Sequence, residues 1–573
     1  MMKAGARRSD AKLPRASRES TTAVAAVWFA MAGATLLPVG GLSAQMTRAP
    51  GADVSAIADR VFAPWNSTRG PGCVVGIDRG GKTLLTRAYG MADLTSERPL
   101  SATSILESGS VAKQFTAMAV MLLMQDGKVA LDADARTYLP ELPTYGRPIT
   151  VRNLLTHTSG LREWSNLVEL QGWPRGTRMH TQDVVFDLIT KQKSLNYPVG
   201  DYYSYTNSGF LLLRTLVERV SGKPFAQFTT ERMFTPLGMS NTRWRDDYTT
   251  VVPGLAQAYR RAGDGWHLDM PFDNIIGAGG MFTTVGDWLI WNRALTSRTL
   301  GAAVTDSMTR QMKLTSGRTI QYAMGLTVSQ YRGTKQISHS GSTAGYSTYL
   351  ARYPEHDDLS IAVMCNAAGA PATAYAHAIV DAMVPTLLTQ SGPITIDVPE
   401  AELQKSVGLY RDTRTNTISE LAVSQGKLRR DGTPLLPLQG GAFQAGALQL
   451  RFAQDARGRM TVEQPTVDGD TVVAVREAIT RWAPSPADLA QFAGRYSNAE
   501  IDAWYTVSVV KDSLHMFLRP GAEGNLRPAF RDTFEDGGDA VWFTRDKKGR
   551  VEAMHVGSGR AWDVVAKRIE KKP

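Results

Sequence analysis

The last third of the chain contains an internal duplication, and this feature limits the possible fold more than any other. In one block, Leu403, Gly408 and Tyr410 recur as Leu489, Gly494 and Tyr496, at an offset of 86 residues. In a later block, Phe452, Asp455 and Gly458 recur as Phe543, Asp546 and Gly549, at an offset of 91 residues. Each copy has short alternating apolar runs interrupted by glycine and charged turns, a pattern typical of antiparallel β-structure. The sequence therefore predicts two small antiparallel β-barrel or β-sheet domains, at residues 391–483 and 484–573.

The part before the duplication, residues 45–390, mixes helical and strand patterns. A chain of 573 residues is too long for one compact domain, so a separate unit is expected here. Five apolar runs near the two ends of this part indicate strands, at 73–78, 82–89, 336–339, 346–351 and 359–365. The patterns between them are helical. We therefore expect an α+β domain whose sheet pairs distant segments, with a helical subdomain inserted between them.

The amino terminus has the order of a secretory signal peptide. Residues 1–44 contain a basic stretch, an apolar run and a small-residue segment that ends at Ala44. We expect cleavage after Ala44 and a periplasmic or secreted protein with no stable membrane span; an uncleaved amino-terminal anchor is the alternative. Of the formal net charge of +10, these residues carry +4, and the remaining basic charge is scattered. No nucleic-acid partner is expected, because binding of that kind uses a concentrated basic patch.

Two cysteines, Cys73 and Cys365, lie in strand-like runs. An exported protein could hold a disulfide between them, but two buried free thiols are the interpretation that we favour. The sequence has no H-E-x-x-H motif and no histidine cluster. No metal and no cofactor are therefore expected.

The strongest chemical signal is Ser110, followed three residues later by Lys113. The apolar residues Val111, Phe115, Met118 and Leu122 predict an amphipathic helix that runs to Gly127. Ser110 then lies in the first turn, where the helix dipole and free N–H groups stabilise an alkoxide and its oxyanion adduct. A buried Lys113 has a lowered pKa and can accept or relay the serine proton.

The Ser-x-x-Lys pattern alone is weak, because it also occurs at Ser9, Ser424 and Ser508. Ser9 is removed with the signal peptide. Ser424 and Ser508 lie in the β repeats, where residues three apart on one strand point to opposite faces. Only Ser110 is expected to meet its lysine.

Two further segments provide candidate partners for Ser110. Tyr205 and Asn207 stand in a loop before a helix expected at 210–220; Tyr205 can serve as a proton relay, and Asn207 can hold the lysine and a substrate amide. His339, Gly341 and Ser342 follow a predicted strand. Gly341 permits close backbone approach, and the Ser342 N–H can join that of Ser110 in an oxyanion hole. A similar pattern at Tyr496 is explained by the repeat.

Taken together, Ser110-x-x-Lys113, Tyr205-x-Asn207 and His339-x-Gly341 resemble the three motifs of the serine penicillin-recognising enzymes: penicillin-binding proteins, class C β-lactamases, and related esterases and D-aminopeptidases. The segments 153–161, 236–239 and 279–284 support this resemblance, which covers about residues 55–390. The duplicated β tail is also similar to the two carboxy-terminal barrels of D-aminopeptidases.

The resemblance implies a five-stranded antiparallel sheet flanked by helices, an active site where the sheet meets the helical subdomain, and an acyl-enzyme on Ser110. Most β-lactamases have lysine where His339 stands. A neutral imidazole is a poor anchor for a substrate carboxylate. We therefore expect an exported aminopeptidase, amidase or esterase acting on a small molecule or peptide, in preference to a β-lactamase or a D-alanyl-D-alanine carboxypeptidase.

Several alternatives stay open at this point. A non-catalytic sensor or cell-wall binder could keep the same fold. The residues do not decide whether Lys113 or Tyr205 is the general base, which of D-amino-acid amides, D-peptides, esters and lactams is cleaved, or what the oligomeric state is. We also hypothesise that one β repeat overhangs the cleft and restricts the choice of substrate. His157 is expected to organise the turn at 156–159.

Overall fold

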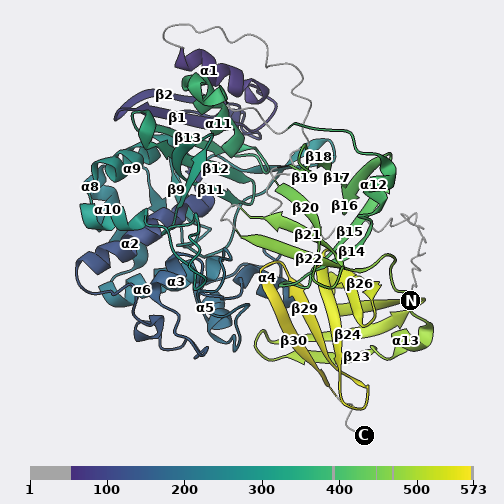
Figure 1. Cartoon of the computed structure of the whole chain (residues 1–573). Helices are drawn as coiled ribbons and strands as arrows, with labels where there is room; N and C mark the ends of the chain where they lie inside the picture. Colours follow the sequence, from purple (N-terminus) through teal and green to yellow (C-terminus); the bar gives the residue numbers. More distant parts are fainter. Residues whose placement is uncertain (1–52, 390–393, 447, 467–469, 570–573) are drawn as a thin grey trace, which may run out of the picture.

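The computed structural model describes residues 53–389, 394–446, 448–466 and 470–569. The expected signal peptide, and the expected boundary at residues 390 and 391, lie outside these residues. Figure 1 shows an amino-terminal region, coloured from purple through teal to green, beside two β modules in green to yellow. We call strands β14 to β22 the first module and strands β23 to β30 the second module. No helix in the described part of the chain is long and apolar enough to cross a membrane.

The amino-terminal region is built on a six-stranded antiparallel sheet with the order β10-β11-β12-β13-β1-β2. Its strands are β1 (Cys73–Arg79), β2 (Lys82–Tyr89), β10 (Thr327–Tyr331), β11 (Thr334–Thr343), β12 (Tyr346–Tyr353) and β13 (Leu359–Cys365). β1 pairs with β13 near the other end of the region, with Val75 opposite Val363. The predicted α+β fold with long-range strand pairing is confirmed. The edge strand β10 adds a sixth strand to the five expected, and its half-buried polar residues give no apolar run to detect.

The expectation of two free thiols is wrong. Cys73 and Cys365 form a disulfide between β1 and β13, across a sequence separation of 292 residues. The two residues stand directly opposite each other in the strand register. Strand-like runs around each cysteine were visible in the sequence, but the register that brings them together was not.

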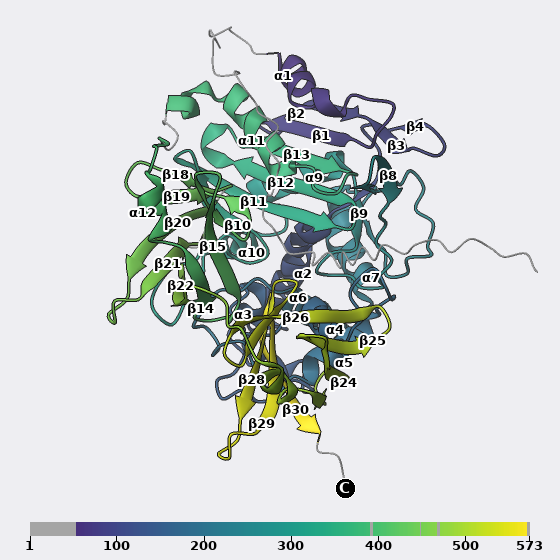
Figure 2. The same cartoon turned by 90° about the vertical axis from the view of Figure 1, so that its right-hand side faces the viewer.

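Helices cover both faces of the sheet (Figures 1 and 2). α1 (Val54–Val61) and α11 (Ala372–Met383) pack on one face with Val75 and Ile77, and α9 (Val285–Ser297) packs on the other, where Val74 points. This alternation follows from the two-residue period of a strand. Beyond α9 lies the helical subdomain, whose helices are α2 (Lys113–Gln125), α3 (Val151–Leu155), α4 (Trp164–Leu170), α5 (Gln182–Thr190), α6 (Asn207–Ser221), α7 (Phe225–Thr229), α8 (Thr235–Leu237) and α10 (Ala302–Met308).

α2 is the central helix of this region. A one-sided apolar helix was expected, but every residue from Lys113 to Leu123 is buried. The polar members of this segment, such as Gln114 and Thr116, are satisfied inside the protein: the Trp291 indole donates to Gln114 at 3.0 Å, and Thr116 donates to the Gly277 carbonyl at 2.7 Å. α2 therefore fixes the residues at its amino-terminal end within a rigid core.

The first module is a nine-stranded sheet that is nearly closed. Its order is β17-β16-β15-β14-β22-β21-β20-β19-β18, so the edge strands β17 and β18 are consecutive in the chain. The module begins with helix α12 (Glu400–Gln404). Its strands are β14 (Gly408–Asp412), β15 (Ile418–Ser424), β16 (Lys427–Arg430), β17 (Thr433–Pro434), β18 (Leu436–Pro437), β19 (Ala442–Ala445), β20 (Leu448–Gln454), β21 (Met460–Pro465) and β22 (Thr471–Ala478).

The second module is a closed eight-stranded barrel preceded by α13 (Pro486–Ala490). Its strands are β23 (Gly494–Asn498), β24 (Ala503–Val510), β25 (Ser513–Arg519), β26 (Ala522–Phe530), β27 (Thr533–Asp536), β28 (Asp539–Arg545), β29 (Val551–Ser558) and β30 (Ala561–Ile569). The prediction of two antiparallel barrel or sheet domains is confirmed. One buried apolar cluster runs from the helical subdomain into this barrel, and the yellow strands lie against α4 in Figure 1.

The duplication is visible in matching local structures. Tyr410 donates its hydroxyl to the Ser406 carbonyl at 2.8 Å, and Tyr496 donates to the Phe492 carbonyl at 2.7 Å, each four residues upstream. Both tyrosines are fully buried and both follow a short helix. The repeated residues in the sequence therefore mark one structural corner made twice.

Candidate active site

Ser110 lies where the core helix begins. It is in the 3₁₀ turn Gly109–Ala112, which continues directly into α2, as the sequence predicted. Ser110 is partly exposed, whereas Gly109 and Val111 beside it are buried. Its hydroxyl is thus presented to solvent from a rigid support, which suits a nucleophile.

Lys113 is fully buried and makes three hydrogen bonds. Its Nζ donates to Ser110 Oγ at 3.1 Å, to Asn207 Oδ1 at 2.7 Å and to the Ala278 carbonyl at 2.8 Å. All three acceptors are neutral. Burial, and to a smaller extent the positive charges of Arg560 and Arg175, hold the Lys113 pKa well below its ordinary value, although Glu163 opposes them. The lysine can therefore be a neutral amine near neutral pH.

Tyr205 lies over Lys113, with Nζ 4.9 Å from the centroid of the phenol ring. Its hydroxyl is buried and has no hydrogen bond of good geometry within the described residues. Burial raises the pKa of Tyr205, and an interaction with the Ser110 hydroxyl partly offsets this rise. The phenol is therefore protonated at neutral pH and lies close to Ser110.

Asn207 is the first residue of α6, three residues before the expected helix start. The Thr206 hydroxyl caps the helix by accepting from the Ser208 amide at 3.2 Å. Asn207 bonds to Glu163 twice, donating from its backbone N–H at 2.5 Å and from Nδ2 at 2.8 Å. The side-chain bond leaves Oδ1 of Asn207 facing Lys113.

Gly341 and Gly109 bring strand β11 against the Ser110 turn. A Cβ on Gly341 would stand 2.2 Å from the Ser108 carbonyl oxygen and 3.1 Å from the Ser110 nitrogen. A Cβ on Gly109, whose φ is +52°, would stand 2.5 Å from the Ser342 nitrogen. Both positions require glycine. The close packing sets the backbone amides of Ser110 and Ser342 on facing segments.

His339 lies within β11, which extends beyond the predicted strand at 336–339 and also contains Gly341 and Ser342. Its ring nitrogens are both used: Nδ1 is 2.6 Å from the Ser340 carbonyl, and Nε2 is 3.1 Å from the Tyr322 hydroxyl. This pattern assigns the proton to Nδ1, with Tyr322 donating to Nε2. Burial and the nearby Lys113 lower the His339 pKa to about 3. His339 is therefore neutral, and its ring packs beside the rings of Tyr322 and Tyr205.

His157 is also buried, at φ +56°. The contacts of His157 are mainly with the segment that contains Tyr205, rather than with the turn at 156–159. Its carbonyl accepts from the Ser204 amide at 3.0 Å, its Nδ1 accepts from the Thr206 amide at 3.2 Å, and its ring lies 4.3 Å from that of Tyr205. The turn at 156–159 is instead held by Asn153, which donates to Thr158 at 2.9 Å.

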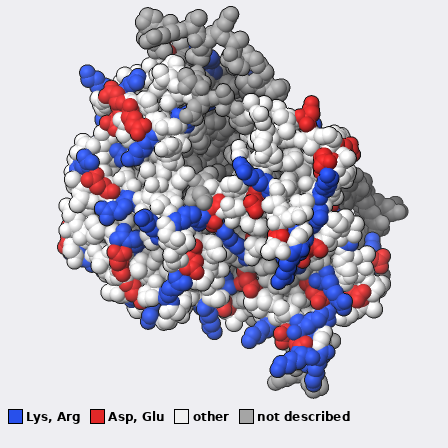
Figure 3. Space-filling view, viewed as in Figure 1, with Lys and Arg blue, Asp and Glu red and all other residues white. Residues whose placement is uncertain are grey.

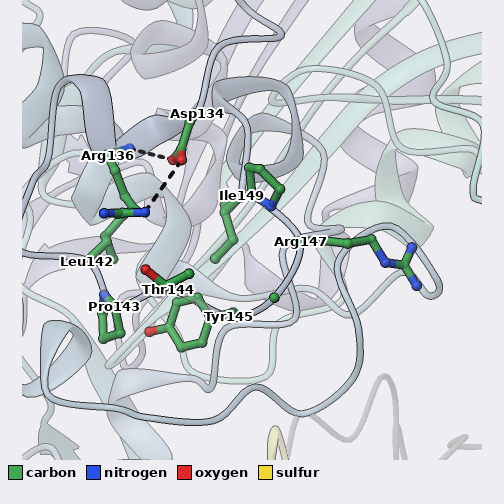
Figure 4. A pocket seen from close by; sticks show the side chains of 10 residues that line it. Asp134, Arg136, Leu142, Pro143, Thr144, Tyr145, Arg147 and Ile149 are labelled. Carbon is green, nitrogen blue, oxygen red and sulfur yellow. Dashed lines mark hydrogen bonds and ion pairs between the residues drawn. The ribbon is translucent and has the colours of Figure 1, made fainter.

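The Ser-x-x-Lys pattern at Ser424 lies in a β-hairpin of the first module. Ser424 and Lys427 lie opposite each other across a tight hairpin, so our argument from opposite faces of one strand was wrong there. Both side chains are exposed to solvent on the first module, unlike the buried Lys113 beside Ser110. A separate small pocket lies in the 134–149 segment, and none of the candidate site residues lines it (Figure 4). The described residues contain no group of His, Cys, Asp or Glu able to hold a metal ion.

Three residues of the site were missed in the sequence. Glu163 is fully buried, Tyr322 is almost fully buried, and Arg560 comes from the turn between β29 and β30 of the second module. None lies within a recognisable motif. The one related signal in the sequence was the duplicated tail. Our hypothesis that one repeat overhangs the cleft concerned the part of the chain that contains Arg560.

The fold and this geometry define a serine hydrolase of the penicillin-recognising type, and comparison with known proteins agrees. The family model described as Beta-lactamase matches residues 57–383, so the chain belongs to this family. The octameric penicillin-binding protein homologue from Pyrococcus abyssi has a similar structure, with a TM-score of 0.52 and 19% identity, over 81% of this chain and 98% of that chain. At this identity the likeness concerns the fold alone.

Relatives with known names extend over most of the chain. It is 26% identical to a D-aminopeptidase of Cereibacter sphaeroides, over 87% of this chain and 92% of that protein. It is 24% identical to a D-aminopeptidase of Brucella anthropi, over 91% and 99%. Penicillin-binding protein 4* of Bacillus subtilis is 29% identical, but over 48% of this chain and 64% of the relative, less than two thirds of its length.

Proposed function

We propose that this chain hydrolyses amide bonds next to D-amino-acid residues, through an acyl-enzyme on Ser110. The observation that carries the proposal is the bond between the buried Lys113 amine and the Ser110 hydroxyl, supported by Tyr205 on the other side. The D-aminopeptidase relatives, which match 87% and 91% of this chain, favour this substrate class.

In the proposed reaction, Lys113 removes the proton as Ser110 Oγ attacks the substrate carbonyl. The lowered pKa of Lys113 suits it as the base, and the raised pKa of Tyr205 keeps a phenol proton available for the leaving amine. The backbone N–H groups of Ser110 and Ser342 hold the oxyanion of the tetrahedral adduct. Water then attacks the ester and gives a proton to the Tyr205 phenolate, while Lys113 returns its proton to Ser110 Oγ, so both groups regain their starting states.

The neutral imidazole of His339 favours an amide or peptide over substrates that present a carboxylate at this position. Both of its nitrogens are engaged, and its pKa is lowered to about 3, so it gives no positive charge. The side-chain NH₂ group of Asn207 donates to Glu163, so Asn207 does not supply a donor for a substrate carboxylate. β-Lactams and D-alanyl-D-alanine peptides, which are recognised through a carboxylate, are therefore weaker candidates.

We also propose that the protein works in an exported, oxidising compartment. Disulfides persist in the periplasm and outside the cell and are rare in the bacterial cytosol. The Cys73–Cys365 disulfide and the amino-terminal sequence pattern support the same location.

The test compares the purified protein with Ser110→Ala on a substrate panel. The panel contains D- and L-alanine anilides, a short ester and a chromogenic lactam. We expect hydrolysis of the D-anilide, loss of all turnover in Ser110→Ala, and a thermal midpoint within a few degrees of the parent. Ser424→Ala, which removes the serine of another Ser-x-x-Lys pattern, is the matched control and should be fully active. Unchanged turnover in Ser110→Ala would refute the proposal, and preference for the lactam would refute the substrate class.

A further inference from the structure

The second module reaches into the active site through the turn between β29 and β30. The backbone of Arg560, at this turn, is bonded to the amino-terminal region in three places. Its carbonyl accepts from the Glu163 amide at 3.2 Å and from the Asn196 side chain at 2.8 Å, and its amide donates to Asn166 Oδ1 at 3.2 Å. These bonds fix where the Arg560 side chain begins.

The Arg560 guanidinium lies between two parts of the site. Nη1 donates to the Tyr205 carbonyl at 3.1 Å, and Nη2 lies 3.7 Å from Glu163 Oε1. The side chain is 25% exposed, whereas Glu163 is completely buried. An isolated buried carboxylate is costly, so Glu163 needs the positive charge and hydrogen bonds that reach it.

Glu163 transmits this contact to the lysine. A carboxylate only accepts hydrogen bonds, so the NH₂ group of Asn207 must point toward Glu163 and its carbonyl oxygen toward Lys113. Burial opposes ionisation of Glu163, but Arg560 and the bonds from Asn207 and Thr206 outweigh it and hold the Glu163 pKa below its usual value. The chain of contacts therefore runs from Arg560 to Glu163, Asn207 and Lys113.

We propose that Arg560 is a positioning residue for the hydrolytic reaction: paired with Glu163, it fixes Asn207 and thereby orients Lys113 toward Ser110. This role adds the second module to the machinery of a site formed otherwise by the amino-terminal region. It goes beyond the proposed substrate class, because it holds for any bond that Ser110 attacks.

The two charges act on Lys113 with opposite signs. Arg560 lowers the Lys113 pKa and Glu163 raises it. The other titratable or charged groups around the lysine are Arg175, His157, His339 and Tyr205. Because the base must be neutral, activity falls as pH drops through the Lys113 pKa. Removing Arg560 should move this acid limb to higher pH, and Glu163→Gln should move it to lower pH.

The experiment uses point variants of the full chain, because the second module shares a buried core with the helical subdomain. The variants are Arg560→Gln, Arg560→Lys, Glu163→Gln and the double variant with both glutamines. The control is Arg519→Gln, which removes another cation of the same barrel, whose guanidinium lies 3.5 Å from the ring centroid of Trp173 in the amino-terminal region. For each, kcat and KM are measured against pH on a substrate that the parent cleaves, with the thermal midpoint.

For Arg560→Gln we expect the acid limb of the kcat–pH profile to move to higher pH by about one unit. At pH values below this limb, kcat should therefore be about tenfold lower than in the parent, and KM should stay within about twofold. Arg560→Lys should recover most of this loss, and Arg519→Gln should match the parent. In the double variant, the two opposite shifts of the acid limb should largely cancel, because the two charges act on Lys113 with opposite signs.

Three results would overturn the proposal. The first is an unchanged pH profile in a folded Arg560→Gln. The second is a rise in KM at constant kcat, which would make Arg560 a substrate-binding residue. The third, which applies even if Arg560→Gln does not fold, is an acid limb in Glu163→Gln that stays in place or moves upward. Ser110→Ala separately tests whether hydrolysis depends on the serine.

Discussion

Removing the Cys73–Cys365 disulfide tests how the two ends of the amino-terminal region are held together. The bond spans 292 residues, and both cysteines are fully buried in adjacent strands. In the chain-entropy model, a cross-link over such a loop destabilises the unfolded state by about 5 to 6 kcal/mol, near the upper end of what disulfides contribute. We expect Cys73→Ala/Cys365→Ala to lower the free energy of unfolding by about 3 to 5 kcal/mol, and activity in the absence of denaturant to be retained.

The assay is equilibrium unfolding in urea, followed by tryptophan fluorescence, with and without a reductant. The matched control is Val75→Ala/Val363→Ala, a neighbouring cross-strand pair buried in the same cluster, which loses apolar volume without losing a cross-link. Reduction should lower the urea midpoint of the parent to about that of the cysteine variant. The valine variant should have a lower midpoint than the parent both with and without the reductant. A parent midpoint that does not move on complete reduction would contradict the reasoning.

Three further predictions concern the site and its surroundings. Tyr205→Phe should lower turnover by about 10² to 10⁴ without lowering the thermal midpoint, because the phenol hydroxyl is buried without a good partner; a large loss of stability would contradict this. Gly341→Ala should abolish turnover, since the new methyl would meet the Ser108 carbonyl, while Gly265→Ala, in open space, should be neutral. Burial raises the pKa of Glu107 to about 7, so the folded state keeps a proton that the unfolded state releases above pH 4.5. The free energy of unfolding should therefore fall by roughly 3 kcal/mol as pH rises through this window, and Glu107→Gln should remove that part of the slope in pH-dependent denaturation.

Much of the fold could be predicted because its signals are local. The strand runs around Val75 and Val363 are short apolar segments, and the repeated Tyr410 and Tyr496 marked both β modules before any pairing was known. What failed was register and turn geometry. The Cys73–Cys365 pairing and the Ser424–Lys427 hairpin each depend on which residues face each other across strands, and composition does not encode that directly.

The site was predictable only where short motifs carry chemistry. Ser110 and Lys113 are three residues apart at a helix start, so their proximity follows from helix geometry. Glu163 and Arg560 are nearly 400 residues apart and belong to different parts of the chain, and their meeting depends on how the closed barrel docks. His339 was placed among the candidate partners of Ser110, but the sequence did not show that the Tyr322 hydroxyl and the Ser340 carbonyl engage both of its ring nitrogens.

The charged surface gives little guidance to the site. Lysine and arginine side chains are interspersed with aspartate and glutamate over the face in Figure 3, in line with the scattered charge of the sequence. The titratable groups on which the proposed chemistry depends, Glu163 and Lys113, are both completely buried.

The paired tyrosine corners of the two modules bear on the history of the protein. Tyr410 and Tyr496 make the same bond to a carbonyl four residues upstream, as expected if one ancestral unit was copied in tandem. Among the described residues, the later copy is the one that forms a closed barrel and carries the arginine beside Glu163. A second copy could thus acquire a role in the active site of an older enzyme while it kept its own fold. A reconstructed ancestral module should therefore fold on its own, without a part in hydrolysis.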